Sequence, residues 1–466
     1  MSRIRITAAS QTDPSLANFS ISHDNAYILP ILQQALQLNP AATVMATLWS
    51  PPGWMKSSDS MIGGSLNAAD YQVFANYLVK FLQAYKNAGV PVSLITPQNE
   101  PEYSPSNYPG ATLTASQEAG FIANDLGPAI QNAGLNTKIL GYDHNWNDTS
   151  FPETILGDSA AAQYTAGTAW HCYSGDPSAQ TTVHNAYPSK DTYFTECSGS
   201  QSANPASTFS DSLDWQTENL IIGATRNWAK SVVTWNMALD WGGPSMNCTT
   251  CTGVVTVDNS AGTATYNAEY YVLGQASKFV KPGAVRIDSN TFGSGNIEDV
   301  AFANPDGSDA LIVLNADTAN AHTFNVDENG QSFTYTLPAK AVATFTWTPG
   351  SGEAPTPPTA APATAPPSSS GPAIAATPIR NGSSSPPAAA TTRSSPATLP
   401  RWDGTLPAVP APQVTESRSS SYSFTPRNNT SECLDVTNAS TADGAGLQQW
   451  SCTGGSNRSF TLNAVN

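Results

Sequence analysis

Strand-like and helix-like patterns alternate from residue 25 to about residue 227, and this alternation limits the fold more than any other feature of the sequence. Apolar residues at helical spacing predict helices over about 28–38, 71–88, 116–132 and 212–228. Short apolar runs that end in polar residues predict strands beginning near Arg3, Val44, Val92, Lys138, Thr168, Thr192 and Ser231. Because strands separated by helices pair in parallel, the leading candidate is an α/β fold of the (β/α)8 TIM barrel type.

The strand count is seven, whereas a closed barrel of this type has eight. The sequence opens directly in the strand-like segment Arg3–Thr7, so we expect the first strand and its helix to be missing. A barrel that lacks one strand has two exposed parallel edges. Residues 1–268 are therefore predicted to form an N-terminally incomplete barrel.

The remainder of the chain is predicted to contain three further segments. Residues 269–348 carry short alternating runs with Asp-Gly and Asn-Gly turns, typical of a small β-sandwich, with strands over 300–303, 310–315, 321–326, 332–337 and 341–347. Residues 349–420 are rich in Pro, Ala, Ser and Thr and are expected to form a disordered linker. Strand-like runs return over 421–466, a segment so short that it needs support such as a disulfide.

Two of the predicted barrel strands each end at a glutamate. The apolar run from Val92 leads into Pro97-Gln98-Asn99-Glu100, and the run Tyr193–Thr195 leads into Glu196. The carboxyl ends of the strands are where an α/β barrel builds its active site. Hydrolysis of a glycosidic bond requires a pair of carboxyl groups, one to protonate the leaving oxygen and one to attack or to activate water. A solvated rim residue or an ion-pair partner is the competing interpretation of either glutamate alone.

The charge balance limits the class of ligand. Charged residues make up 12% of the chain and the net charge is −16, so nucleic acid and anionic membranes would be repelled. A neutral ligand such as a sugar fits this balance. No run of about 18 apolar residues occurs, and no transmembrane segment is expected. We further expect a monomer with no metal and no cofactor.

Four of the six cysteines are expected to form two disulfides. Cys433 and Cys452 lie alone in the last segment, so a bridge between them is the simplest interpretation. Cys248 and Cys251 form a CxxC motif, for which we favour a loop disulfide, with the other two cysteines close together on adjacent strand ends. The alternative is a four-sulfur zinc site built from Cys172, Cys197, Cys248 and Cys251.

The cysteines, several Asn-x-Ser/Thr sites and the Pro/Thr-rich linker are typical of an extracellular protein. The first ten residues lack the apolar segment of a secretory signal. We therefore expect a secreted protein whose signal peptide lies upstream of Met1.

From Arg3 to Trp347 the chain resembles glycoside hydrolase family 30, which contains glucosylceramidases and endo-β-1,6-glucanases. The resemblance rests on the segments 49–56 (WSPPGWMK), 96–101 (TPQNEP), 141–146 (GYDHNW), 171–173 (HCY), 195–199 (TECSG), 235–240 (WNMALD) and 270–280. Members of this family retain anomeric configuration. The resemblance therefore implies that Glu100 is the general acid/base and Glu196 the nucleophile, with their carboxyl groups about 5–5.5 Å apart. It further implies a raised pKa at Glu100 and donors that keep Glu196 ionised.

The resemblance also implies roles for the neighbouring residues. Asn99 would bind the sugar 2-hydroxyl, Trp49 and Trp235 would form the floor and wall around the sugar, and Asn236 would lie beside them. His171 and Tyr173 would orient Glu196 or the substrate. Asp143 is a weaker candidate for substrate binding. Arg3 fits the arginine that the family places after its second strand, whereas the loop with the downstream aspartate of the family is not recognisable here.

The last segment resembles one repeat of a ricin-type β-trefoil, through Cys-Leu-Asp-Val, Asp-Gly and Gln-Gln-Trp-Ser-Cys. A full trefoil has three such repeats. The resemblance implies a partial carbohydrate-binding unit with sugar contacts from Asp435, Gln448, Gln449 and Trp450. Together these features predict a retaining glycosidase acting on a β-glucan or a β-glucoside such as glucosylceramide, or else a non-catalytic carbohydrate-binding protein or an inactive truncated fragment.

Overall fold

The computed structural model describes residues 12–200, 205–240, 248, 250–290, 292, 296–328 and 330–350, and five strands between residues 413 and 461. The chain divides into two units, residues 1–371 and 372–466, and each is described by itself.

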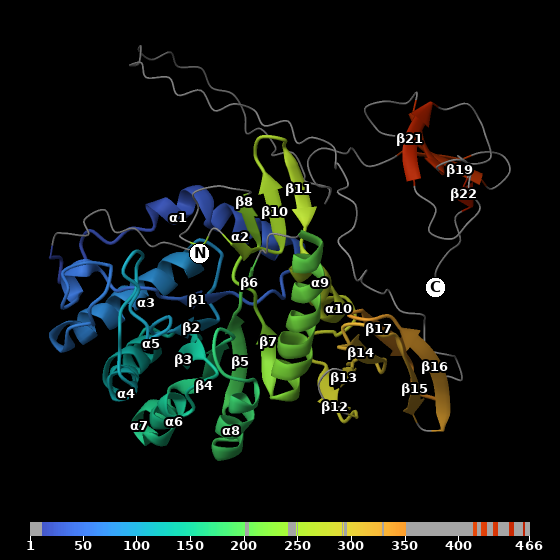
Figure 1. Cartoon of the computed structure of the whole chain (residues 1–466). Coiled ribbons are helices and arrows are strands. Elements are labelled where there is room, and N and C mark those ends of the chain that lie inside the picture. The colour runs from blue at the N-terminus through green and yellow to red at the C-terminus, as the bar shows by residue number, and fades with distance from the viewer. Residues whose placement is uncertain are drawn as a thin grey trace, which may run out of the picture. The chain divides into compact units, whose positions relative to one another are not determined.

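A curled sheet of six parallel strands forms the centre of the first unit (Figure 1). The strands pair in the order β1 (Met45–Thr47), β2 (Leu94–Thr96), β3 (Lys138–Asn145), β4 (Thr165–His171), β5 (Asp191–Glu196) and β7 (Ala229–Val232). Six of the seven predicted strands are confirmed, and the one at Arg3 lies outside the described residues. Within the described residues β1 and β7 form the two edges of this sheet.

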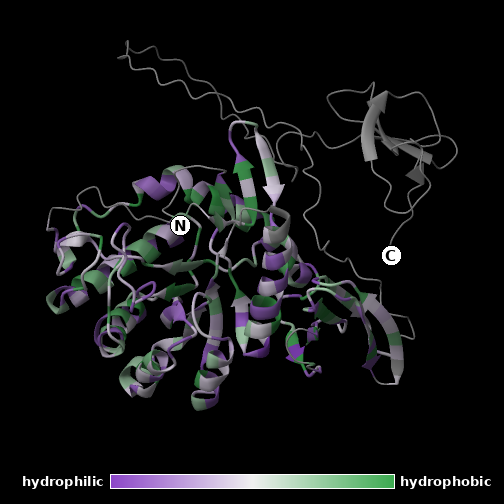
Figure 2. Ribbon diagram, in the orientation of Figure 1, coloured by the Kyte–Doolittle hydropathy of each residue, from purple (hydrophilic) through white to green (hydrophobic). Residues whose placement is uncertain are grey.

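Helices cover the outer face of the parallel sheet. They are α1 (Ser22–Tyr27), α2 (Leu29–Leu38), α3 (Tyr71–Asn87), α4 (Ala115–Phe121), α5 (Gly127–Asn132), α6 (Ser150–Gly157), α7 (Ser159–Ala162) and α8 (Ser178–Ala186). Helix α9 (Pro205–Gln216) belongs to a second hydrophobic core. Short helical turns lie at Gly53–Met55 (η1), Ala68–Asp70 (η2), Ile122–Leu126 (η3) and Thr217–Ala224 (η4). Figure 2 shows hydrophobic residues along the strands and mixed faces on the helices, as expected for helices packed against a core.

Local sequence explains the best-predicted helix and its end. Helix α3 buries Phe74, Leu78 and Phe81 at helical spacing against the core. Gly89 follows with φ +78°, a conformation that glycine adopts at little cost, and ends the helix. The amphipathic pattern therefore predicted both the helix and its boundary.

A second layer of antiparallel strands follows the barrel segment. One sheet pairs β12 (Val285–Ile287), β13 (Ile297–Ala303), β14 (Asp309–Asn315) and β17 (Val342–Trp347), and a hairpin joins β15 (His322–Glu328) to β16 (Gln331–Leu337). The five predicted strands of this segment are confirmed, and β12 is additional. Helix α10 (Ala268–Ser277) and α9 share a hydrophobic core with this sheet, which joins the two layers within the first unit.

Five further strands of the first unit were missed by sequence reasoning. A small sheet contains β11 (Thr263–Tyr266), β10 (Val255–Asp258) and β8 (Ala238–Asp240), and β6 (Gly199–Ser200) pairs with β9 (Cys251–Thr252). In the second unit, β18 (Gln413–Glu416), β19 (Ser421–Thr425) and β22 (Phe460–Thr461) form one sheet, and β20 (Glu432–Val436) pairs with β21 (Leu447–Ser451). The predicted linker lies largely outside the described residues, although β18 falls within its expected range. None of the helices in the described part of the chain combines the length and apolar character needed to cross a membrane.

Candidate active site

The two predicted glutamates meet at the carboxyl edge of the parallel sheet. Strand β5 ends on Glu196, and Glu100 lies four residues beyond the end of β2. One carboxylate oxygen of each glutamate and a ring nitrogen of His171 all lie within 4.8 Å of one another. This separation is close to the ~5–5.5 Å of retaining glycosidases and well below the ~6.5–9.5 Å that an inverting pair needs for its water.

His171, at the end of β4, stands between the two glutamates. Its Nδ1 lies 3.1 Å from Glu100 Oε1 and 4.0 Å from Glu196 Oε1, and its Nε2 lies 3.1 Å from Asp143 Oδ1. Burial disfavours the charged ring, but Glu196, Asp143 and Glu100 outweigh it and raise the pKa of His171 to about 10. The imidazolium therefore serves as a fixed positive charge beneath the pair. The same three side chains are close enough to share a metal ion, for which His171 would have to lose its proton.

Asp143, a weak candidate from sequence, is the anchor of this arrangement. The residue is buried, and its carboxylate accepts hydrogen bonds from Thr47 at 2.6 Å, Thr96 at 2.7 Å and Thr195 at 2.8 Å, in addition to the His171 contact. Burial raises the pKa of Asp143, but these donors and the His171 charge lower it to a net value below the ordinary one. The side chain is thus an ionised, fully bonded group that fixes the imidazole.

The backbone beneath Asp143 is distorted. Tyr142 and Asp143 have φ values of +79° and +54°, and the pairing of β3 with β4 shifts register between Tyr142 and His144. The carbonyl of Asp143 accepts a hydrogen bond from Glu100 N at 3.0 Å, and Glu100 itself has φ +46°. Left-handed conformations at residues other than glycine are costly and gather at functional sites. The distorted backbone brings the carboxylates of Asp143 and Glu100 to the same side chain, His171, which both contact.

The pKa of Glu196 differs from the expectation that neighbouring donors keep this carboxyl group ionised. Its side chain accepts a hydrogen bond from Tyr173 Oη at 3.0 Å, and both Tyr173 and the positive His171 favour its charged form. Burial outweighs them and raises the pKa of Glu196 to about 7. The predicted donors are present, but desolvation is the larger effect.

Four other predicted binding residues carry buried polar atoms that have no hydrogen-bond partner among the residues the structure describes. These atoms are Trp49 Nε1, Asn99 Oδ1, Trp235 Nε1 and Asn236 Nδ2. A buried donor or acceptor without a partner costs about 1–3 kcal/mol. Such groups suit a ligand rich in hydroxyl groups, which would satisfy them on binding.

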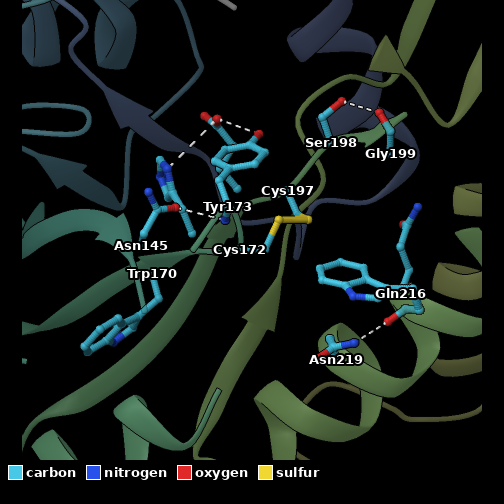
Figure 3. Close-up of a disulfide and its surroundings, with 12 residues drawn as sticks. Asn145, Trp170, Cys172, Tyr173, Cys197, Ser198, Gly199, Gln216 and Asn219 are labelled. Atoms are coloured by element: carbon cyan, nitrogen blue, oxygen red, sulfur yellow. Dashed lines mark hydrogen bonds and ion pairs between the residues drawn. A yellow bond between two sulfur atoms is a disulfide. The ribbon is translucent and has the colours of Figure 1, made fainter. Parts of the chain in front are cut away.

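A disulfide joins the strand ends that carry the site. Cys172 and Cys197 are bonded, and each adjoins site residues in sequence: His171 and Tyr173 on one side, Glu196 on the other (Figure 3). The predicted Cys248–Cys251 bridge is also present. The alternative of a zinc site is therefore wrong, because disulfide sulfurs are not the thiolates that bind zinc. Cys452 lies outside the described residues, so its predicted bond to Cys433 stays a prediction.

Two groups of predicted residues are not placed at this site. Arg3 lies outside the described residues. In the lectin-like segment the strands pair Asp435 with Gln448, Leu434 with Gln449 and Cys433 with Trp450, so the four predicted sugar contacts lie on one two-stranded ladder.

Sequence reasoning missed several residues that support the site. The three threonines on Asp143 each lie at or beside the end of a predicted strand, a position that signals a site only once the strands are aligned. Glu118, in α4, is fully buried and its Oε1 accepts a hydrogen bond from Tyr142 N at 2.9 Å. A glutamate within a helix-like pattern of residues does not indicate that its side chain will be buried beside a site.

A curled parallel sheet with a close carboxyl pair at its carboxyl edge, followed by an antiparallel sheet domain, defines the class of (β/α) barrel proteins with a glycosidase-type site. A family model for the glycosyl hydrolase family 30 TIM-barrel domain matches residues 1–280, and one for the family 30 β-sandwich domain matches residues 283–345. The chain belongs to glycoside hydrolase family 30. A ricin-type β-trefoil lectin domain-like model matches residues 413–466.

Individual relatives agree with this assignment. The chain is 38% identical over 320 residues to an endo-1,6-β-D-glucanase of Neurospora crassa, a match that covers 65% of each protein. It is 29% identical over 372 residues to the lysosomal acid glucosylceramidase of Mus musculus, covering 74% of this chain and 70% of the relative. The solved structure of an endo-β-1,6-glucanase has a TM-score of 0.67 and 35% identity, over 73% of this chain and 78% of that one. The chain thus spans about two thirds of the length of the Neurospora protein.

Proposed function

We propose that the chain is a retaining glycoside hydrolase that cleaves β-glucosidic bonds by double displacement. The observation that carries the proposal is the approach of Glu100 and Glu196 to within 4.8 Å, with His171 between them. Residues 1–268 would form the catalytic barrel and 269–348 its companion sandwich. Residues 349–420 would be the linker and 421–466 a partial sugar-binding repeat.

In the first step a Glu196 carboxylate oxygen bonds to the anomeric carbon as the bond from that carbon to the leaving oxygen breaks. The Glu100 proton passes to the leaving oxygen. In the second step Glu100 takes a proton from water, the water oxygen bonds to the anomeric carbon, and the bond to Glu196 breaks. Two inversions return the β configuration.

The residues around the pair have matching roles. The imidazolium of His171 and the hydroxyl of Tyr173 stabilise the charged form of Glu196, which is the attacking form. The unpartnered atoms of Asn99, Trp49, Trp235 and Asn236 would bind hydroxyl groups of the sugar. Asp143 would hold His171 and the backbone of Glu100 in place without touching substrate.

The substrate is proposed to be a β-1,6-linked glucan, with glucosylceramide as the alternative. The Neurospora relative is an endo-1,6-β-D-glucanase, and the more distant Mus musculus relative is a glucosylceramidase. The bonded cysteines support a secreted protein, since disulfides persist in oxidising compartments.

The test compares Glu100→Gln and Glu196→Gln on two substrates. β-Glucosyl fluoride has a leaving group that needs no proton, whereas a β-1,6-linked gluco-oligosaccharide needs one. Glu196→Gln should lose roughly 10²–10⁴-fold or more in kcat/KM on both, and Glu100→Gln should lose a comparable factor on the oligosaccharide alone. Equal turnover by wild type and Glu196→Gln would end the enzymatic interpretation and leave sugar binding without catalysis.

A further inference from the structure

Tyr103 lies directly beside the proposed proton donor, on the chain reversal that follows it. Its backbone N–H donates a hydrogen bond to the carbonyl of Glu100 at 2.9 Å. The Tyr103 residue is 50% exposed, so part of its ring surface is accessible to a ligand. With Glu100 as the proton donor, the departing group leaves next to the chain segment that carries Tyr103.

Tyr103 is the outermost of three connected aromatic side chains. The ring of Trp49, at the end of β1, lies 5.4 Å from the ring of Tyr108 at an angle of 52°. The side chains of Tyr108 and Tyr103 in turn lie close enough to interact electrostatically. Burial raises the pKa of Tyr108, and the charges of Tyr103, Glu100 and Glu196 raise it further. Trp49 and Tyr108 are half-buried and Tyr103 is exposed, so exposure to solvent increases from Trp49 and Tyr108 to Tyr103.

The loop that carries these tyrosines is held rigidly. Lys56 is 3% exposed and its Nζ donates to Ser50 Oγ at 2.8 Å, to Met61 O at 2.9 Å and to Gly110 O at 2.6 Å. Three acceptors for a buried ammonium match its three donors. Lys56 thereby fastens the loop after β1 to the loop after β2.

Further bonds connect the same two loops. Gly110 N donates to Met61 O at 3.0 Å, and Thr112 N donates to Gly64 O at 3.0 Å. The backbone that presents Tyr103 and Tyr108 is thus fixed in advance of any ligand, which reduces the entropy lost on binding.

We propose that Tyr103, supported by Tyr108 and Trp49, forms a binding site for the glucosyl unit on the leaving-group side of the scissile bond, so that the chain selects a glucan over a glycolipid. This rests on the proposed function, since it takes Glu100 as the proton donor. A sugar ring offers a C–H face to an aromatic ring and hydroxyl groups to the two tyrosine hydroxyls. A ceramide chain would cover those hydroxyls without bonding them, which costs about 1–3 kcal/mol per group left unbonded.

The experiment measures kcat/KM of wild type, Tyr103→Phe and Tyr103→Ala on three substrates. These are β-glucosyl fluoride, which has nothing on the leaving side, a β-1,6-linked glucotetraose and glucosylceramide. We expect Tyr103→Ala to lose about tenfold on the tetraose and to stay within about twofold of wild type on the fluoride and on glucosylceramide. Tyr103→Phe keeps the ring and should fall between the two on the tetraose.

A matched control is Tyr27→Ala, which removes another exposed tyrosine, in α1, and should leave all three substrates unchanged. Thermal unfolding checks that each variant is folded. Unchanged tetraose cleavage by Tyr103→Ala, or an equal loss on tetraose and fluoride, would overturn this inference while the proposed function stood. No turnover of the fluoride by wild type would instead refute the proposed function.

Discussion

The Asp143 carboxylate and the His171 imidazole form a buried ion pair, with Oδ1 and Nε2 3.1 Å apart and the two side chains 2% and 1% exposed. The opposite ring nitrogen of His171 faces Glu100 and Glu196. Asp143 also accepts the backbone N–H of Glu100 through its carbonyl. One residue of β3 therefore fixes both the charge beneath the carboxyl pair and the backbone of one of its members.

Replacing His171 by glutamine should move the acidic limb of the pH–activity profile to higher pH. Glu196 must be ionised to attack, so activity appears as pH rises through its pKa. That pKa is raised to about 7 by burial and held down by the His171 charge, so loss of the charge raises it further. The measurement is kcat/KM against pH on β-glucosyl fluoride. A limb that stays in place or moves to lower pH would show that His171 is not charged in the free enzyme.

The same variant should show a pH-dependent stability difference. The pKa of His171 is raised from 6.5 to about 10, so the folded state holds its proton more tightly than the unfolded state. The resulting stabilisation is complete below about pH 6.5 and is lost as pH rises through 10. The free energy of unfolding of wild type relative to His171→Gln, measured in urea, should therefore fall steadily between pH 7 and pH 10.

Tyr173→Phe removes a single hydrogen bond to Glu196. A hydrogen bond to a charged group contributes about 1.5–3 kcal/mol, so kcat/KM should fall roughly 10–100-fold and the acidic limb should again move upwards. Tyr187→Phe is the matched control, because the Tyr187 hydroxyl donates to the Glu153 carbonyl away from the carboxyl pair. If both variants lose activity equally, the Tyr173 contact has no special role.

Glu118→Gln and Glu118→Met separate two properties of the buried Glu118 side chain. One is its protonation state, and the other is the hydrogen bond that it accepts from Tyr142 N, next to Asp143 in sequence. Burial raises the pKa of Glu118 to about 8, so the residue is a neutral acid at pH 7 that accepts from Tyr142 N. Glutamine keeps a neutral acceptor and should retain activity. Methionine leaves the buried N–H unbonded, so it should cost about 1–3 kcal/mol of stability and also lower kcat.

The pH dependence of the free energy of unfolding gives a second measure of the protonation state of Glu118. A carboxyl group whose pKa is raised on folding destabilises the fold progressively as pH rises from its unfolded value of about 4.5 to about 8. Glu118→Gln should therefore gain stability relative to wild type over that range. A difference that is constant with pH would mean that Glu118 is ionised throughout.

The two disulfides should differ in their contributions to the free energy of unfolding and to kcat. The Cys172–Cys197 bond closes a separation of 25 residues and joins the strand ends of the site. Replacing both cysteines by alanine should cost about 3 kcal/mol and lower kcat, because Tyr173 and Glu196 lose a shared tether. The control pair Cys248→Ala and Cys251→Ala opens a separation of only 3 residues and should cost less in the free energy of unfolding and leave kcat unchanged. Equal effects on kcat would contradict a positioning role.

The sequence predicted the strands, and the positions of the two glutamates at strand ends, well because each signal is local. An apolar run that stops at Pro97 or at Glu196 marks a strand end wherever it occurs, and parallel strands bring such ends together. The importance of Asp143 was underestimated, since its partners lie on four different strands or strand ends and only the assembled sheet brings Thr47, Thr96 and Thr195 to one carboxylate. The raised pKa of Glu196 was missed for the same reason, because burial is a property of the whole fold.

The hairpin of β10 and β11 and its partner β8 were missed for a different reason. Their strands are short and carry Thr and Asp at alternate positions, without the apolar runs that marked the barrel strands. These missed strands do not affect the assignment of Glu196 as the nucleophile, which trapping of the glycosyl-enzyme intermediate tests.

The most direct measurement is the mass of peptides from enzyme treated with 2-deoxy-2-fluoro-β-glucosyl fluoride, a substrate whose covalent intermediate breaks down slowly. The predicted result is one fluoroglucosyl group on the peptide that contains Glu196, with no label in Glu196→Gln. Label on another residue, or hydrolysis of β-glucosides that yields α-glucose first with no labelled peptide, would contradict double displacement by Glu100 and Glu196.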